Sequence, residues 1–72
     1  MDDVTAQRIS YDDNQRVDYL GWSKPGIEDD ERGWMIVKIE YDDNDNVVAR
    51  KWASGNNNKD KIWDNRANYT YI

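Results

Sequence analysis

A segment of fifteen residues occurs twice in this chain, and the second copy starts thirty residues after the first. Residues 8–22 and 38–52 align without a gap, with seven identical positions: Ile, Tyr, Asp, Asp, Asn, Val and Trp. Ordinary composition gives about one identity in such a window, so the repeat is real. Each copy places a polar Asp-Asp-Asn stretch between two stretches with strand-like alternation, which is typical of a β-hairpin. The repeat therefore predicts an all-β fold that uses one hairpin twice.

Five short strands are expected from the alternation of apolar residues and the positions of turn-forming residues. The expected strands cover residues 6–11, 16–22, 34–41, 47–53 and 68–72. A short helical turn is expected at 60–67, with Asp60 as its N-cap, and Pro25-Gly26 matches the central pair of a type II turn. The predicted fold is a small five-stranded antiparallel meander, barrel or sandwich built from two repeated hairpins.

Alternation along each expected strand assigns its side chains to two faces. In the second strand, it places Val17 and Tyr19 on one face, and Asp18, Leu20 and Trp22 on the other. The third strand is the most hydrophobic and is expected to be central in the fold. One of its faces carries Met35, Val37, Ile39 and Tyr41, and the other carries Trp34 and Ile36 near its start.

The length of 72 residues allows one domain at most. We expect a flexible polar lead at residues 1–5 and a single small β domain at residues 6–72. A domain of this size buries only about 60% of the surface of its unfolded chain. Cys is absent, so no disulfide supports the fold, and four Trp and five Tyr must supply a dense core.

The charge is acidic, with 15 Asp and Glu against 10 Lys and Arg, a net charge of −5 and a pI near 4.5. This balance disfavours direct binding of nucleic acid through a basic patch. The longest apolar run, residues 34–37, is too short to span a membrane, and the N-terminus has no signal-peptide pattern. We therefore expect a soluble protein that is made in a cytoplasm and contacts neither nucleic acid nor a membrane.

Residues typical of catalytic sites are scarce. The chain lacks His, the usual near-neutral acid–base group, and Cys, the usual thiol nucleophile. Its carboxylates do not lie within apolar stretches that would raise their pKa values, and it has no glycine-rich phosphate loop. We therefore predict no catalytic residues and no cofactor, and an enzyme is the least favoured class.

The Asp-Asp-Asn turns raise the question of calcium. Residues 42–46 begin like an EF-hand loop, but Val47 occupies the glycine position and Ala53 the position of the bidentate glutamate. We predict plain hairpin turns and no metal site, although a cation at these turns remains an alternative. The acidic run at residues 28–31 has the same two interpretations: a solvated loop, or a site for a divalent ion or a basic partner.

Aromatic residues are the most prominent candidates for binding. They are Trp22, Trp34, Trp52 and Trp63, with Tyr69 and Tyr71 near the C-terminus. In so small a domain, these rings are expected to form the core or a subunit interface. The alternative is a platform on which sugars stack.

Several motifs along the chain resemble a known group of proteins. They are Tyr-Leu-Gly-Trp-Ser-Lys-Pro-Gly at 19–26, Trp-Met-Ile-Val-Lys-Ile-Glu-Tyr-Asp at 34–42, Trp-Ala-Ser-Gly at 52–55 and Trp-Asp-Asn-Arg-Ala-Asn-Tyr-Thr-Tyr at 63–71. Together they resemble a family of small, mostly uncharacterised tailed-bacteriophage proteins and domains, over about residues 8–72. The block at 63–67 is the most specific part. Trp22-Ser23 and the acidic loop at 28–31 depart from the family outline.

The resemblance implies a non-enzymatic accessory or structural module of the virion: a capsid decoration protein, or a head–tail or tail component. Such a module would act by docking on phage capsid or tail proteins, as a homo-oligomer or within a symmetric assembly. Trp and Tyr anchors with an occasional Arg are typical of interface hot spots. The residues expected to dock are Trp34, Trp63, Arg66, Tyr69 and Tyr71.

Two other classes of function remain open. The first is an acidic phage inhibitor of a host nucleic-acid-binding protein, in which carboxylates imitate phosphates; a salt-sensitive complex with such a protein would favour it. The second is a carbohydrate-binding module of a receptor-binding device; tryptophan fluorescence that responds to host polysaccharide would favour it.

Overall fold

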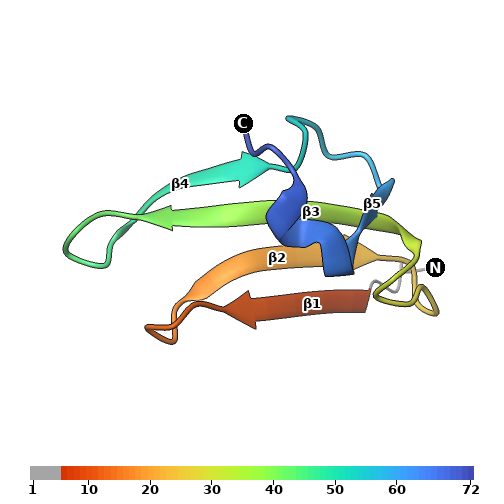
Figure 1. The fold of residues 1–72 in the computed structure, drawn as a ribbon, viewed down its shortest axis with the longest axis horizontal. Helices are drawn as coiled ribbons and strands as arrows, with labels where there is room; N and C mark the ends of the chain where they lie inside the picture. Colours follow the sequence, from red (N-terminus) through yellow and green to blue (C-terminus); the bar gives the residue numbers. More distant parts are fainter. Residues whose placement is uncertain (1–5) are drawn as a thin grey trace, which may run out of the picture.

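Two β-hairpins lie side by side in one antiparallel sheet (Figure 1). The computed structural model describes residues 6–72, and the lead expected at 1–5 lies outside this range. The first hairpin consists of β1 (Ala6–Tyr11) and β2 (Val17–Ser23), and the second of β3 (Arg32–Tyr41) and β4 (Val47–Trp52). The strand order is β1-β2-β3-β4. The all-β prediction is confirmed, and the sheet is a meander.

The two hairpins have the same turn. In the first, the N–H of Asp12 donates to the carbonyl of Arg16 at 2.8 Å, and in the second the N–H of Asp42 donates to the carbonyl of Asn46 at 2.9 Å. Gln15 and its equivalent Asp45 both adopt the left-handed conformation, with φ of 67° and 65°. The repeat in the sequence is therefore a repeat in the backbone, and both tips lie at the same end of the sheet (Figure 1).

Each hairpin also contains a bulge beside its tip. Ser10 pairs with Tyr19, but the next residue, Tyr11, pairs with Val17, which leaves Asp18 as an extra residue in β2. The same shift occurs in the second hairpin and leaves Val48 as the extra residue in β4. Because a bulge reverses the alternation that follows it, Val17 lies on the face of Leu20. The prediction that Val17 shares a face with Tyr19 was wrong.

The C-terminal quarter differs most from the expectation. Residues 61–62 form the short strand β5 (Lys61–Ile62), which pairs with the start of β3. A 3₁₀ helix, η1 (Trp63–Asn68), follows directly. Its N-cap residue is Ile62 and it has no side-chain cap, so Asp60 does not cap it as predicted. Instead, the carboxylate of Asp60 forms an ion pair with the ammonium of Lys61.

The strand expected at 68–72 is also corrected. Asn68 ends η1, and beyond it Tyr71 forms only a single bridge with Ala53. Ile72 then exchanges two hydrogen bonds of 3.2 Å with the backbone of Trp52. The segment returns to the outer edge of β4 only at its last residues, because η1 occupies the preceding ones.

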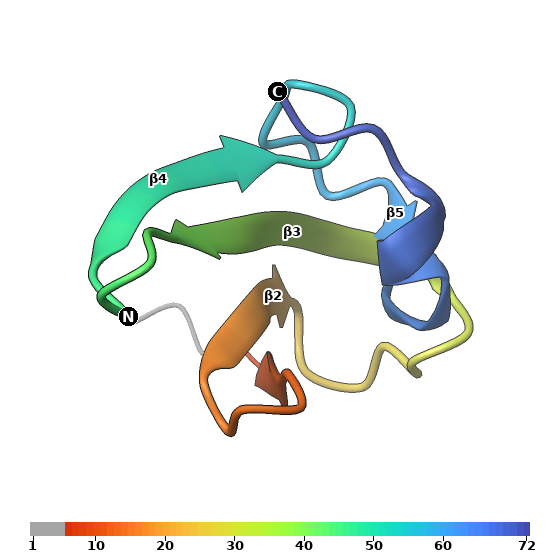
Figure 2. The same ribbon diagram turned by 60° about the vertical axis from the view of Figure 1, so that its left-hand side comes forward.

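The core lies on one face of the sheet, which we call the covered face. Trp34 and Ile36 of β3 project from this face and pack with Ala53 and with Trp63 of η1. Figures 1 and 2 show η1 on this side of the sheet, in front of β2 and β3 in the first view. The rings of Trp34 and Trp63 lie with their centroids 6.0 Å apart. The core is thus a single layer between the sheet and the C-terminal segment.

The loop between the hairpins folds toward the covered face. Gly26 has a φ of +95° in the expected turn, and the N–H of Ile27 points to the carbonyl of Lys24 at 3.4 Å, as a type II turn requires. The indole N–H of Trp34 donates to the carbonyl of Glu28 at 3.0 Å, which ties the acidic loop to the core. In residues 6–72, no helix is long and apolar enough to cross a membrane.

Candidate docking surface

The opposite face of the sheet is apolar, and η1 and the C-terminal segment do not lie on it. We call it the open face. Its side chains follow from the strand registers, since residues paired across two strands point to the same side. They are Gln7, Ile9, Tyr11, Val17, Leu20, Trp22, Met35, Val37, Ile39, Tyr41, Val47, Arg50 and Trp52. Ile9 and Val47 are 47% and 58% exposed, so this face presents hydrophobic side chains to solvent.

Two equivalent tryptophans lie on the open face at the end opposite the hairpin tips. Trp22 projects from β2 opposite Met35, and Trp52 projects from β4 opposite Val37. Their ring centroids lie 6.5 Å apart with an interplanar angle of 43°, so the two indoles meet across β3. Between such large neighbours Val37 is only 3% exposed. The face is thus packed within itself, although nothing in the described chain lies on top of it.

A shallow apolar hollow of about 480 Å³ lies on the open face, near the hairpin tips. Its lining residues are Val17, Leu20, Ile39, Tyr41, Val47 and Arg50. Arg50 is the only charged residue among them, and within residues 6–72 it also provides the only charged side chain of the open face. A ligand of this surface would therefore be held mainly by apolar contact.

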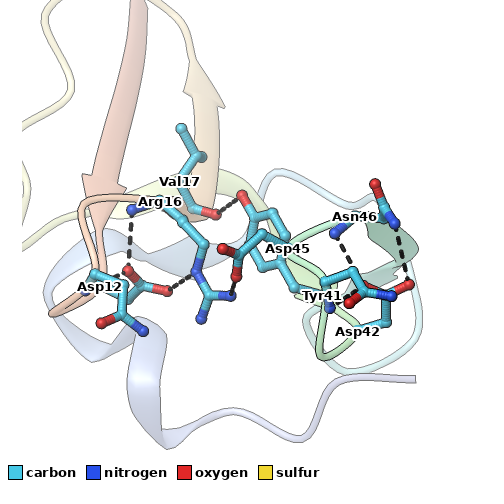
Figure 3. Close-up of polar contacts among 9 residues, drawn as sticks. Asp12, Arg16, Val17, Tyr41, Asp42, Asp45 and Asn46 are labelled. Atoms are coloured by element: carbon cyan, nitrogen blue, oxygen red, sulfur yellow. Dashed lines mark hydrogen bonds and ion pairs between the residues drawn. The ribbon is translucent and has the colours of Figure 1, made fainter.

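The hairpin tips are joined by Arg16 (Figure 3), which lines a hollow on the opposite face of the sheet. Its guanidinium lies 3.0 Å from the carboxylate of Asp12 and 2.6 Å from that of Asp45. It also stacks over the ring of Tyr41 at 4.5 Å, while the Tyr41 hydroxyl donates to the carbonyl of Val17 at 2.7 Å. Tyr41 is thereby fixed between the hairpins, with its ring at the edge of the open face.

The turn carboxylates bind the backbone of their own turns. Asp42 accepts hydrogen bonds from the backbone N–H groups of Asn44 at 2.8 Å and Asn46 at 3.0 Å. These bonds, that of Asn46 first, lower the pKa of Asp42 below its ordinary value. In Asp12, the backbone N–H of Arg16 is the main cause of a lowered pKa. The predicted turn role is confirmed. Among residues 6–72 no cluster of three metal-ligating side chains is found.

Trp34 and Trp63, two of the five predicted docking residues, are core residues. Trp34 is 0% and Trp63 5% exposed. A partner of the folded chain cannot reach rings that are packed between the sheet and η1. Their assignment to a docking rim is therefore corrected, and the expectation that the tryptophan rings form the core is confirmed for these two.

The other three predicted docking residues, Arg66, Tyr69 and Tyr71, surround this core. Arg66 stacks over the ring of Trp63 at 4.7 Å. The hydroxyl of Tyr69 accepts the N–H of Ile62 at 2.8 Å, and that of Tyr71 donates to the carbonyl of Arg66 at 2.6 Å. Burial raises the pKa of Tyr71 well above that of a free tyrosine. The structure thus brings all five residues together, and they hold the C-terminal segment on the covered face.

A polar hollow of about 410 Å³ lies beside β5. Its buried cation is Lys61, whose ammonium donates to the side-chain carbonyl of Asn56 at 2.9 Å and pairs with Asp60. The nearby guanidinium of Arg32 points to the carbonyl of Asp60 at 3.5 Å. These contacts fasten the loop 54–60 to the start of β3, so both cations already have a structural role.

Comparison of the chain with protein-family models, with curated proteins and with solved structures finds no match in any of the three. Its function is therefore inferred from its own residues and their geometry. The residues that the sequence left out of the candidate site are those of the open face. Alternation had already placed four of them on one face of β3, and the equivalence of Trp22 and Trp52 was a further signal.

Proposed function

We propose that this protein is a non-enzymatic structural module of a tailed-bacteriophage particle and acts by protein–protein docking through its open face. In this proposal it is an accessory component of the capsid, the head–tail joint or the tail, present in the virion in symmetric copies. The phage assignment comes from the motifs at 19–26, 34–42, 52–55 and 63–71. The docking mode comes from the geometry.

The observation that supports docking is the apolar sheet face without a layer over it. Charged residues make up 35% of the chain, yet the open face has Arg50 as its only charged member. Exposed contiguous apolar patches on soluble proteins commonly mark surfaces for other proteins. A sheet normally buries each apolar face against a second layer of structure, and the open face lacks such a layer within the described chain. A partner that supplied the second layer would bury the Trp22–Trp52 pair.

The experiment is quantitative mass spectrometry of phage particles purified from a host in which the chain is expressed. We expect the chain in a fixed stoichiometry to the major structural proteins after extensive washing. The variant Val47→Lys should lower its occupancy at least tenfold. The variant Val48→Lys should leave the occupancy unchanged. Val48 is as exposed as Val47, at 60% against 58%, but it borders the opposite face of the sheet. Absence of the wild-type chain from washed particles would rule out this function.

A carbohydrate-binding module is the second candidate, and the Trp22–Trp52 pair favours it. Two indoles at 6.5 Å on an accessible face are the kind of aromatic surface on which sugar rings stack. A titration of tryptophan fluorescence with host polysaccharide tests this function. A saturable change that Trp52→Ala abolishes would support the carbohydrate function, and an unchanged spectrum would rule it out.

A further inference from the structure

We infer that the open face binds a second copy of this chain, sheet against sheet, in a symmetric dimer. This inference deepens the proposed function and rests on it for the use of the open face as a docking surface. It goes further in naming the partner. The distribution of the carboxylates and the match between two sheets of the same twist support it. The area of the face and the position of the hairpin tips determine how strong the dimer is and how it is oriented.

The distribution of carboxylates favours a like partner. Two copies of a chain with a net charge of −5 repel each other, so contact between them requires a surface free of acid. Among the residues that the structure describes, the open face contains no Asp or Glu. Asp18 of β2 and Glu40 of β3 instead line the hollow of the opposite face, together with Lys38. The acidic loop at 28–31 is tied to the covered face through Glu28 and Trp34.

The shape also favours a like partner. Two antiparallel sheets of the same twist can pack face to face at a separation of about 10 Å. Because the twist has a fixed hand, the sheets of two copies of this chain have the same twist. Such a pair would be a β-sandwich in which each chain supplies one layer and its own covered face remains outside.

The area indicates a weak, reversible dimer. Four strands at a spacing of about 4.8 Å and seven residues at about 3.4 Å give a face of roughly 450 Å². Two such faces would bury roughly 900 Å², which is below the about 1,000 Å² expected of a stable specific interface. We therefore expect monomer and dimer to exchange in the micromolar concentration range.

The hairpin tips determine which symmetric dimer is favoured. Both tips lie at one end of the sheet and carry five aspartates around Arg16. The aspartates are Asp12, Asp13, Asp42, Asp43 and Asp45. A twofold axis along the strands would place the tips of the two copies together, and their carboxylates would repel. An axis across the strands places them at opposite ends, so we expect this arrangement.

A matched pair of variants tests the surface. Val47 and Val48 are neighbours of the same residue type with 58% and 60% exposure, but they border hollows on opposite faces. Val47→Lys and, independently, Ile9→Lys insert a charge into the proposed interface. Val48→Lys makes the same change outside it. All three positions are exposed, so the variants are expected to fold, and circular dichroism before each measurement checks this.

Sedimentation equilibrium of the full chain between 5 µM and 1 mM measures the monomer–dimer equilibrium. We expect the average mass of the wild type to rise from 8.6 kDa toward twice this value. Val47→Lys and Ile9→Lys should weaken the association at least tenfold, while Val48→Lys leaves it unchanged. Added salt should strengthen it, because salt screens the repulsion of two acidic chains. A wild type that remains monomeric at 1 mM, or equal effects of Val47→Lys and Val48→Lys, would overturn the inference.

The orientation is tested with a single spin label. Because the chain has no Cys, Asn14→Cys gives one labelling site at a hairpin tip. Tips at opposite ends should give label distances of about 30 Å or more, the length of nine strand residues. Distances under about 20 Å would overturn the axis across the strands.

The inference and the proposed function can fail separately. If the chain is found in washed particles but is monomeric in solution, the proposed function is supported and the dimer is ruled out. If the chain dimerises through the open face but is absent from particles, the dimer is supported and the phage role is ruled out.

Discussion

A Cβ atom on Gly21 would lie 2.7 Å from the ring of Trp63, because the indole rests directly on the backbone of β2. Such a separation is shorter than a van der Waals contact, so a side chain at this position must displace the ring. Gly21 is therefore what allows η1 to approach the sheet, and the closeness of this contact determines the thickness of the core.

The first prediction is that Gly21→Ala destabilises the fold. The added methyl group would push Trp63 away from Trp34, and overpacking of this kind costs about 1–3 kcal/mol. Urea unfolding monitored by tryptophan fluorescence measures the loss. The double variant Gly21→Ala/Trp63→Leu should show less than the sum of the two single effects, because a smaller side chain above position 21 relieves the clash. Strict additivity would contradict the proposed contact.

The second prediction concerns the ion pairs of Arg16. Arg16→Gln removes contacts with both Asp12 and Asp45, and we expect a fall of a few degrees in the melting temperature at low salt. High salt should reduce the difference, because exposed charges are screened. Asp45→Asn alone and combined with Arg16→Gln completes a double-mutant cycle. An effect of Asp45→Asn that is the same with and without Arg16 would show that the two side chains do not interact.

The third prediction is a loss of stability in acid that arises at the hairpin tips. Hydrogen bonds from the backbone lower the pKa values of Asp12 and Asp42 in the folded chain. A carboxyl group with a lower pKa in the folded state stabilises the fold above its unfolded pKa, near 3.8, and this contribution is lost as the pH falls toward the folded value. The free energy of unfolding should therefore decrease as the pH falls below about 4.

Variants of one turn separate this effect from general acid unfolding. Asp42→Asn should flatten the acid limb of the stability curve, because the residue no longer titrates. Asp43→Asn removes the same charge from the same turn and serves as the control. If both variants gave the same acid limb, the hydrogen bonds of Asp42 would not be the cause.

The fourth prediction concerns Tyr71. Burial raises its pKa, so ultraviolet titration should show one tyrosine that ionises after the others. A group with a raised pKa in the folded state stabilises the fold below its unfolded pKa, near 10, and loses this contribution as the pH rises above it. Tyr71→Phe should remove the late step. It should also cost about 1 kcal/mol at neutral pH, because the hydrogen bond to the carbonyl of Arg66 is lost.

The hairpins could be predicted from the sequence because their signals are local. The Asp-Asp-Asn turns and the alternation around Ile9 and Ile39 act within a few residues, and the repeat doubled each signal. The bulges could not be predicted. An extra residue such as Asp18 or Val48 has no composition of its own, and its position is determined by pairing with the neighbouring strand.

The candidate site was harder to predict, because both faces of β3 carry apolar residues near the start of the strand. Which face is covered depends on the path of residues 54–72, and there the expected helix and strand were displaced. Residues 61–62 pair with β3, so η1 begins later than predicted and lies over Gly21. Trp34 and Trp63 were therefore assigned to a docking surface, although tertiary packing places them inside.

The Arg16–Asp45 ion pair gives the two hairpins distinct identities. The residue equivalent to Arg16 in the second hairpin is Asn46, and the residue equivalent to Asp45 in the first is Gln15. The cation therefore belongs to one hairpin and its anion to the other, although their backbones coincide. If chains exchanged hairpins during folding, two copies of the second would bring Asp45 against Asn46 without a compensating charge. Misassembly between like units is thus penalised at the hairpin tips, where the two copies of the repeat differ in charge.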